Sequence, residues 1–213
     1  MQVVLSLDWD HFTGDCQDVS VNASCGWSCC EEKYGTTFDE NGRGSVQLSP
    51  FDEAQVLAEV RRVARHIRRT ERFVVAESHG SLYWLLGNGD RVFDLDSHHD
   101  NDDEDTRLTC GNWVLAAKRG KHIIYKRPPQ LKDGRWSLRV FPRVFDLVFL
   151  CRSSPWTPWE FDKLFNTLIA EIARKSATPV RWYGHRAKEL QIDFRYMERE
   201  GRLLVSTPVK KNT

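Results

Sequence analysis

Short apolar runs that end in polar side chains limit this chain to a small set of folds. The runs occupy residues 2–7, 73–76, 91–95 and 145–151, and residues 122–125 form a further plausible strand. Continuous apolar runs of this length are typical of strands that are covered on both faces, as in a parallel sheet. Because the carboxyl ends of parallel strands meet at one edge of the sheet, we expect the polar side chains after the runs to lie together.

Helices are predicted between these runs. Ser49 is the expected N-cap of one helix and Pro50 its first residue, and apolar residues then recur at helical spacing at Val56, Leu57, Val60, Val63, Ala64 and Ile67. Residues 157–160 have the pattern of a capping box, and the apolar stripe of a second helix follows at Phe161, Leu164, Phe165, Leu168, Ile169 and Ile172. Alternating strands and helices favour an α/β fold, a three-layer αβα sandwich with a mainly parallel sheet.

The composition is that of one globular domain. The chain has 213 residues, of which 40% are hydrophobic, and its 31 basic side chains oppose 30 acidic ones. A net charge near zero gives no general attraction to nucleic acid or to an anionic membrane. The sequence has no apolar run of about 18 residues and no signal-peptide pattern, so we expect a cytoplasmic protein with reduced thiols.

Charge is nevertheless uneven along the chain. Residues 61–72 contain six Arg and one Glu, and residues 94–105 contain seven carboxylates and no Lys or Arg. We expect the arginines to form a solvated helix surface, with a binding patch as the alternative. The acidic residues 102–105 could steer a cationic substrate or simply form a solvated loop.

A long polar stretch, residues 13–48, shows little periodicity. Within a single domain spanning residues 1–213, it is expected to be a loop or a lid over the substrate. Its Cys25, Cys29 and Cys30 could form half of a zinc site, but no matching Cys or His pair lies at the usual spacing. Elsewhere, Cys110 and Cys151 are expected to be small apolar fillers.

Side chains of metal-ligand type gather at the predicted strand ends. They are Asp8, Asp10, His11, Glu77, His79, Asp96, His98, His99 and Asp100. Each alone is a common helix cap or hydrogen-bonded residue, but together so many carboxylates would repel one another unless cations neutralised them. Carboxylates with imidazoles suit Mn²⁺ or Mg²⁺, and two such ions could share a carboxylate and make a water nucleophilic.

Two of these motifs resemble those of the arginase (ureohydrolase) superfamily. Residues 96–100, Asp-Ser-His-His-Asp, are similar to its Asp-Ala-His-x-Asp motif, and residues 6–10, Ser-Leu-Asp-Trp-Asp, are similar to its Ser-x-Asp-x-Asp motif. The peptide arginases of ribosomal-peptide biosynthesis resemble the chain more closely. Residues 74–79 (VVAESH) and 111–113 (GNW) also match that branch.

The resemblance implies an arginase-like fold with two Mn²⁺ ions. The implied metal ligands are Asp8, Asp10, His79, Asp96, His98 and Asp100. Asp8 and Asp96 would bridge the ions, His79 and Asp100 would complete the shell of one ion, and the remaining two ligands would complete the other. The Asp-x-Asp motif normally follows the other motifs, so its place at the start of this chain implies a circular permutation.

The reaction implied by the resemblance is hydrolysis of peptidyl arginine to ornithine and urea. A water activated by the metal pair would attack the guanidinium carbon, and Asp100 or Glu77 would accept its proton. Val114 occupies the place of the usual proton-shuttle His, so another acid must protonate the leaving amine. We expect His99 in this role, with Glu77 and His185 as alternatives.

Substrate contacts and partners follow from the same resemblance. Asn112 is expected to bind substrate, and Trp156 could stack on a guanidinium or line a peptide groove. The expected partner is an arginine-containing precursor peptide, with neither nucleic acid nor membrane involved, and a homo-oligomer is left open. Two rival interpretations are a metal-dependent amidohydrolase or deacetylase on a related scaffold, for which one zinc suffices, and a non-enzymatic binding protein with a decayed site.

Overall fold

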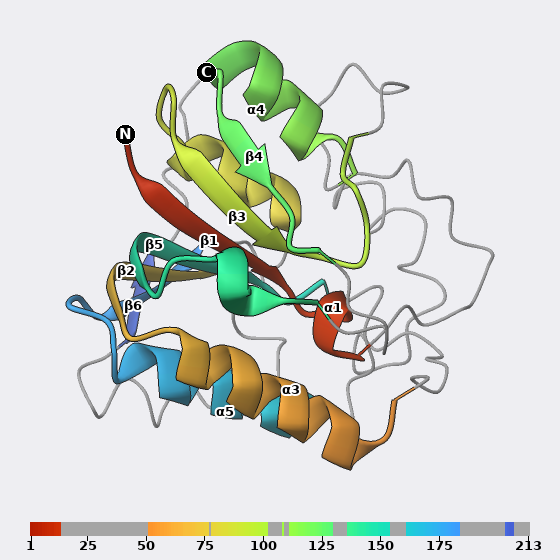
Figure 1. Ribbon diagram of the computed structural model, residues 1–213. Helices are drawn as coiled ribbons and strands as arrows, with labels where there is room; N and C mark the ends of the chain where they lie inside the picture. Colours follow the sequence, from red (N-terminus) through yellow and green to blue (C-terminus); the bar gives the residue numbers. More distant parts are fainter. Residues whose placement is uncertain are drawn as a thin grey trace, which may run out of the picture.

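The fold is built on a seven-stranded sheet with the order β4-β3-β1-β5-β2-β6-β7. The computed structural model describes residues 1–13, 51–76, 78–101, 108, 111–129, 136–153, 161–183 and 203–206. The strands are β1 (Val3–Asp8), β2 (Arg69–Ala76), β3 (Arg91–Leu95), β4 (Ile124–Lys126), β5 (Val144–Cys151), β6 (Val180–Tyr183) and β7 (Leu203–Ser206). Every neighbouring pair is parallel (Figure 1), so the described sheet is parallel throughout.

Helices cover both faces of this sheet. On one face α3 (Glu53–His66) and α5 (Asp162–Ala173) enclose a core cluster that includes Leu5, Val75 and Leu150. On the other face α4 (Trp113–Lys121) and the 3₁₀ helix η1 (His79–Leu85) enclose a second cluster. The α/β class is therefore confirmed, and the arrangement in Figure 1 is compatible with a three-layer sandwich.

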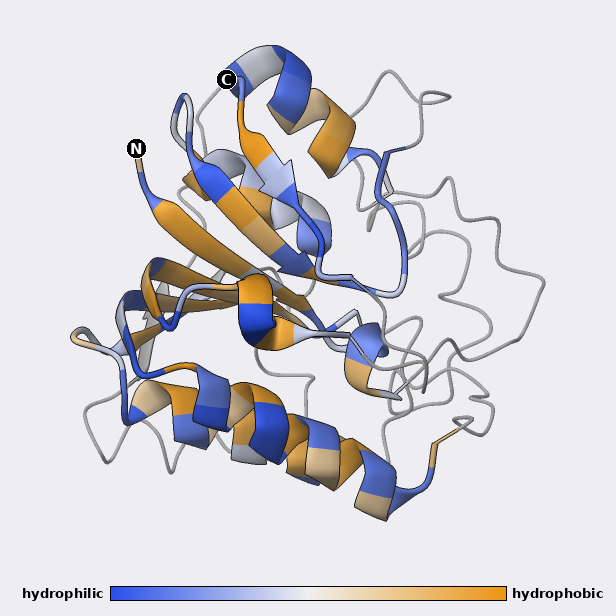
Figure 2. Cartoon of the chain, in the orientation of Figure 1, coloured by the Kyte–Doolittle hydropathy of each residue, from blue (hydrophilic) through white to orange (hydrophobic). Residues whose placement is uncertain are grey.

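The hydropathy of each element matches its place in these layers. β1 and β5, in the middle of the sheet, are buried along nearly their whole length. In Figure 2, β1 is mostly hydrophobic, whereas α3 combines hydrophobic and hydrophilic residues. The buried positions of α3 are Val56, Val60, Val63 and Ala64. The predicted apolar stripes of the two long helices are thus largely buried, as expected for helices that pack by one face.

The start of α3 differs from the sequence prediction. The N-cap is Asp52 rather than Ser49, and the helix begins at Glu53. Asp52 Oδ1 accepts a hydrogen bond from the backbone N–H of Gln55 at 2.7 Å, and Gln55 Oε1 accepts one from Asp52 N–H at 2.9 Å. This reciprocal capping box satisfies two backbone donors and fixes the start of the helix, whereas Ser49 and Pro50 lie outside the described residues.

Other elements agree with the sequence to different degrees. The boundaries of β3 match the prediction, those of β1, β4 and β5 differ by one or two residues, and β2 begins four residues earlier than expected, at Arg69. The capping box at 157–160 and residues 14–48 of the expected loop, with its cysteines, lie outside the described residues, whereas Thr13 ends the short helix α1 (Asp10–Thr13) and does not belong to a loop. Cys110 also lies outside the described residues, whereas Cys151 is buried at the end of β5, as expected of a filler. Among the described helices, none has the length and apolar character to cross a membrane.

Candidate metal site

Four central strands bring the motif residues to one edge of the sheet. β1 lies between β3 and β5, and β5 also pairs with β2. Leu7 pairs with Leu95, and Cys151 pairs with both Asp8 and Ala76, so all four strands end at nearly the same level. The residues that follow each strand are therefore placed next to one another, and the first strand along the chain delivers its Asp-x-Asp motif beside the Asp-x-His-x-Asp motif.

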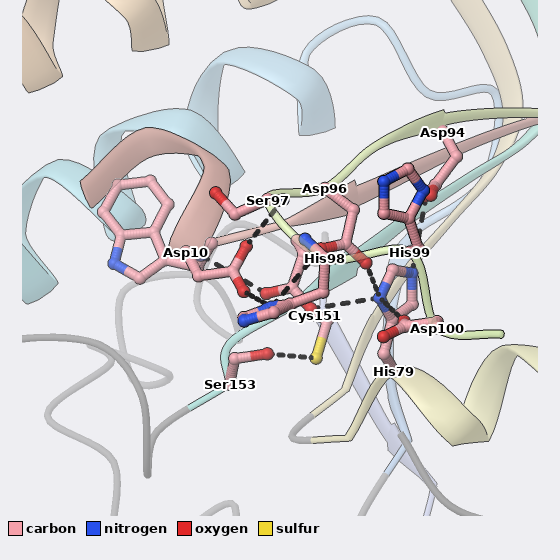
Figure 3. Close-up of polar contacts among 12 residues, drawn as sticks. Asp10, His79, Asp94, Asp96, Ser97, His98, His99, Asp100, Cys151 and Ser153 are labelled. Atoms are coloured by element: carbon pink, nitrogen blue, oxygen red, sulfur yellow. Dashed lines mark hydrogen bonds and ion pairs between the residues drawn. The ribbon is translucent and has the colours of Figure 1, made fainter. Parts of the chain in front are cut away.

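His79 lies at the centre of the first group of ligand atoms. Its Nδ1 is 3.0 Å from Asp8 Oδ2, 3.0 Å from Asp96 Oδ2 and 3.1 Å from Asp100 Oδ2. A ring nitrogen can donate one hydrogen bond at most, so it cannot satisfy three carboxylates. Within the described chain, neither this nitrogen nor Asp96 Oδ2 has a hydrogen bond of good geometry, although both are buried. The convergence of these atoms is what a cation site requires, and Figure 3 shows Asp96 and Asp100 turned toward His79.

A second group consists of Asp10, Asp96 and His98. His98 Nδ1 is 2.8 Å from Asp10 Oδ2 and 3.8 Å from Asp96 Oδ1. In each of the two groups, Asp8–His79–Asp96 and Asp10–Asp96–His98, one ligand atom per residue lies within 4.8 Å of the others. Asp96 belongs to both groups and turns a different carboxylate oxygen toward each. The two groups differ in access, because the His98 side chain is 45% exposed whereas His79 is fully buried.

Backbone hydrogen bonds hold the loop after β3 in place. Asp96 Oδ1 accepts from His98 N–H at 2.6 Å, and Asp10 Oδ1 accepts from Ser97 N–H at 3.3 Å. Asp100 adopts a left-handed conformation with φ of 45°, a region in which Asp is more frequent than most residues. Its carbonyl oxygen accepts from Val114 N–H at the start of α4. The loop thus turns back to the site and supplies ligands from both of its ends.

A buried polar chain supports His79 from behind. His79 Nε2 is 2.5 Å from Ser6 Oγ and 3.7 Å from Asp94 Oδ1, and Tyr125 donates to Asp94 Oδ2 at 2.7 Å. Ser6 and Asp94 are register partners on β1 and β3, so their side chains share one face of the sheet. Sequence reasoning missed both residues. The signal was available, because each is a polar residue inside an otherwise apolar run.

Trp113 makes contacts with Asp100 and His79 that the sequence did not predict. Its Nε1–H donates to Asp100 Oδ2 at 2.5 Å, and its ring lies 4.8 Å from the His79 ring, centroid to centroid. Trp113 is fully buried. It thus packs against one proposed ligand and orients another.

Burial and charge shift the pKa values of the site in opposite directions. Burial alone would lower the pKa of His79, but its close contacts with the carboxylates of Asp100, Asp8 and Asp96 raise it well above its usual value. Burial, followed by the charges of Asp100 and Asp10, raises the pKa of Asp96 well above its ordinary range. Burial opposes ionisation of Asp8 as well, yet its contacts with His79 leave its pKa lowered. A proton on His79 therefore partly neutralises the carboxylates, a task that a divalent cation would take over.

Arg127 fixes the orientation of His99. Its Nη1 donates to His99 Nδ1 at 2.7 Å, and its Nη2 donates to the backbone oxygen of Asp96. A guanidinium has no acceptor, so His99 Nδ1 must accept and the ring proton must lie on Nε2. His99 is exposed. Its donor atom is therefore Nε2.

The structure brings all six predicted ligands together at one edge of the sheet. The other residues predicted for the site lie elsewhere or outside the described part of the chain. His11 lies outside both groups and contacts Glu59 at 3.0 Å. Asn112 is buried at the N-cap of α4, next to Trp113. Glu77, Trp156 and His185 lie outside the described residues.

Comparison of the chain with protein-family models, with curated proteins and with solved structures gives no match. The class of site is defined by its geometry: a carboxylate- and imidazole-lined cluster at the carboxyl edge of a parallel sheet that could hold a metal ion.

Proposed function

We propose that this chain is a dinuclear metal-dependent hydrolase that converts arginine residues of a peptide to ornithine and releases urea. The observation that supports this most strongly is the position of Asp96, whose Oδ2 faces His79 and whose Oδ1 faces His98. A carboxylate that turns one oxygen to each of two adjacent groups is suited to bridge a pair of divalent ions.

Manganese is the proposed ion because of the donor set. Four carboxylates and two imidazoles make a hard, oxygen-rich site, and no thiol belongs to either group within the described residues. The one described thiol, Cys151, contacts Ser153 Oγ at 3.1 Å instead. Two divalent ions held by this set would lower the pKa of a water molecule and so supply a nucleophile near neutral pH.

The residues around the two groups have proposed parts in the reaction. The carboxylates attract a guanidinium electrostatically. After water adds to the guanidinium carbon, the bond from that carbon to the side-chain nitrogen breaks, and ornithine and urea form. Asp100 is proposed to accept the proton of the water and to return it to the departing amine, and His99 is proposed to donate a hydrogen bond to the substrate through its Nε2–H. Glu77 remains an alternative acid or base, and Asn112 and Trp156 remain the proposed substrate contacts.

A circularly permuted arginase-like arrangement is part of the proposal. It is supported by the interior place of β1, which pairs with β3 on one side and β5 on the other. A strand in that position can supply Asp8 and Asp10 whatever its place in the order of the chain. A precursor peptide, rather than free arginine, is proposed because no set of groups for a free α-amino and α-carboxylate is apparent.

The test is a urea assay on an arginine-containing peptide with added Mn²⁺. The expected result is urea release together with a peptide mass loss equal to CH₂N₂ for each converted residue. Asp96→Asn should abolish both, because it removes one charge from the shared ligand at almost constant shape. Asp52→Asn is the matched control, since Asn also caps helices and Asp52 lies at the exposed start of α3. Undiminished urea release by Asp96→Asn would refute the metal assignment.

A one-metal amidohydrolase or deacetylase is the second candidate. It is favoured by the difference in burial between the two groups, since His98 is 45% exposed while the ligand atoms around His79 are enclosed. Metal analysis separates the candidates. Two ions per chain support the arginase-like proposal, whereas one ion per chain, with activity toward acetylated lysine peptides and no urea release, supports the alternative.

A further inference from the structure

We infer that a pocket lined by four arginines binds a small ligand bearing a phosphate group. The pocket, called the arginine pocket below, has a volume of about 350 Å³. The polar side chains that line it are Arg62, Arg65, His66, Ser137, Arg139 and Arg143. They come from the last turns of α3, from the 3₁₀ helix η2 (Leu138–Val140) and its N-cap, and from the residue before β5.

The arginine pocket is separate from the candidate metal site. Arg143 directly precedes β5, whereas Cys151 ends that strand at the metal edge. At about 3.3 Å per residue, the eight residue steps from Arg143 to Cys151 separate the two by roughly 26 Å. The pocket therefore lies toward the opposite edge of the sheet, and the inference is independent of the proposed function.

Positive charge in the pocket exceeds its negative charge. Glu59 is paired with Arg62 through contacts of 2.5 and 2.6 Å. Arg65 contacts only the backbone oxygen of Arg61, at 3.2 Å, and among the described residues Arg139 has no ion pair or hydrogen bond through its guanidinium. Two guanidinium groups are thus without a described carboxylate beside a cavity large enough for a ligand.

The remaining arginine has a structural contact that keeps it at the pocket. Arg143 Nε and Nη2 donate to the backbone oxygens of His66 and Arg65, at 3.2 and 3.4 Å. These carbonyls lie at the C-terminal end of α3, where helix carbonyls lack backbone partners. These two hydrogen bonds therefore fix the position of the Arg143 guanidinium at the pocket.

The lowered pKa of His66 reflects burial together with the positive charge of the neighbouring arginines. This pKa is lowered from the usual value, first by burial and then by the charges of Arg143 and Arg62, although the contact of His66 with Pro142 opposes the shift. His66 Nε2 lies 2.7 Å from the Pro142 oxygen and therefore donates to it. An anion in the pocket would relieve the repulsion among these cations.

A phosphate group fits this chemistry better than a single carboxylate. The planar guanidinium fork binds two oxygens at once, and phosphate offers several oxygens with up to two charges. The volume lies in the range of small-molecule sites, which leaves room for an organic part against the buried Leu138. For Arg62 and Arg65 the proposal takes up the alternative interpretation of the arginine-rich segment, a binding patch rather than a solvated surface alone.

Calorimetric titration of the full chain with inorganic pyrophosphate tests the inference. The expected result is saturable one-to-one binding, weakened at least tenfold in Arg65→Gln/Arg139→Gln, since each charge-assisted hydrogen bond contributes about 1.5 to 3 kcal/mol. Neither residue pairs with a described carboxylate, so circular dichroism should show an intact fold. Arg61→Gln/Arg181→Gln, which also removes two positive charges but from exposed residues outside the pocket lining, should bind pyrophosphate as the unaltered chain does.

Three outcomes would overturn the inference. They are the absence of saturable binding to the unaltered chain, equal binding by the double variant, and tighter binding of a tetra-aspartate peptide than of pyrophosphate, which would indicate an acidic peptide as the ligand. Asp96→Asn distinguishes the two sites. It should leave pyrophosphate binding unchanged, so failure of the proposed function would not affect this result.

Discussion

The two ring nitrogens of His79 have different partners and different tasks. Nδ1 faces three carboxylate oxygens, whereas Nε2 lies 2.5 Å from Ser6 Oγ. If Nδ1 binds a metal ion, the ring proton must lie on Nε2 and donate to Ser6, a support that fixes both the tautomer and the ring orientation. The polar residues inside β1 and β3 are thus explained as the partners of one buried imidazole.

Metal binding should release a proton from His79. The neighbouring carboxylates raise its pKa well above the usual value despite burial, so the imidazole is protonated at neutral pH without metal. Metal affinity should therefore increase as pH rises toward that raised pKa. Titration calorimetry with Mn²⁺ in two buffers of different ionisation enthalpy should give different heats. Identical heats in both buffers would contradict this protonation state.

Trp113→Phe should weaken metal binding by about 10 to 100-fold. The substitution keeps an aromatic ring against His79 but removes the Nε1–H that donates to Asp100 at 2.5 Å. Competition with a fluorescent chelator would measure the affinity. Trp84→Phe is the control, because Trp84 is 63% exposed and belongs to neither ligand group. An equal loss in both variants would show that Trp113 does not orient Asp100.

At the residue level, the sequence predicted which side chains lie together wherever a short motif of Asp and His residues follows a strand. All six proposed ligands lie at one sheet edge, because strand ends and short motifs specify that position locally. Trp113 and Arg127 could not be assigned in this way. Their contacts with Asp100 and His99 depend on how α4 and the segment after β4 pack, which is a tertiary property. Tryptophan and arginine are also common in cores and on surfaces, so neither type indicates a site by itself.

At the scale of elements, the apolar runs predicted where the strands lie along the chain better than they predicted how long each strand is. β2 extends back to Arg69 because Arg69 and Thr70 pair with Val144 and Phe145 of β5, although the segment is polar. β6 and β7 were not predicted. Arg181 interrupts the apolar residues of β6, whereas the apolar run of β7, residues 203–205, was overlooked although it is as long as that of residues 123–125. The N-cap of α3 was misplaced because two candidate caps, Ser49 and Asp52, lie three residues apart, and each is followed three residues later by a side chain that can complete a capping box.

Glu59 on α3 should stabilise the fold at neutral pH and lose this effect in acid. Burial opposes its ionisation, but hydrogen bonds from Arg62 and His11 lower its pKa from 4.5 to about 2. Its contribution is present above the unfolded pKa of 4.5 and is lost as pH falls toward 2. Glu59→Gln should therefore cost about 1 to 3 kcal/mol at pH 6 and little near pH 2.

Urea denaturation of the variant and the unaltered chain at both pH values would measure this difference. Glu53→Gln, an exposed change on the same helix, should show a much smaller pH-dependent effect. A Glu59→Gln penalty that is constant with pH would indicate lost packing rather than the ion pairs with Arg62 and His11.

For the whole molecule, metal binding should raise thermal stability. A site assembled from the ends of three strands, β1, β2 and β3, exists only in the folded chain, so a ligand that binds it stabilises that state. Mn²⁺ at one hundred times its dissociation constant should add about 2.7 kcal/mol. Differential scanning calorimetry should show this increase for the unaltered chain and for Asp52→Asn, but not for Asp96→Asn. Equal stabilisation of all three would place the bound ion elsewhere.

The interior place of β1 also determines the order in which the fold can be completed. Val3 N–H is bonded to Asp146, 143 residues later, and Arg91 N–H to the Gln2 oxygen. During synthesis β1 therefore leaves the ribosome long before either neighbouring strand exists, with its apolar side chains uncovered. Pairing between strands so far apart in the sequence slows folding, and until it occurs β1 is an unpaired apolar segment that is prone to aggregation. The sheet can close around β1 only after β5 has been made, so the nascent chain is the form of this protein that most needs a chaperone.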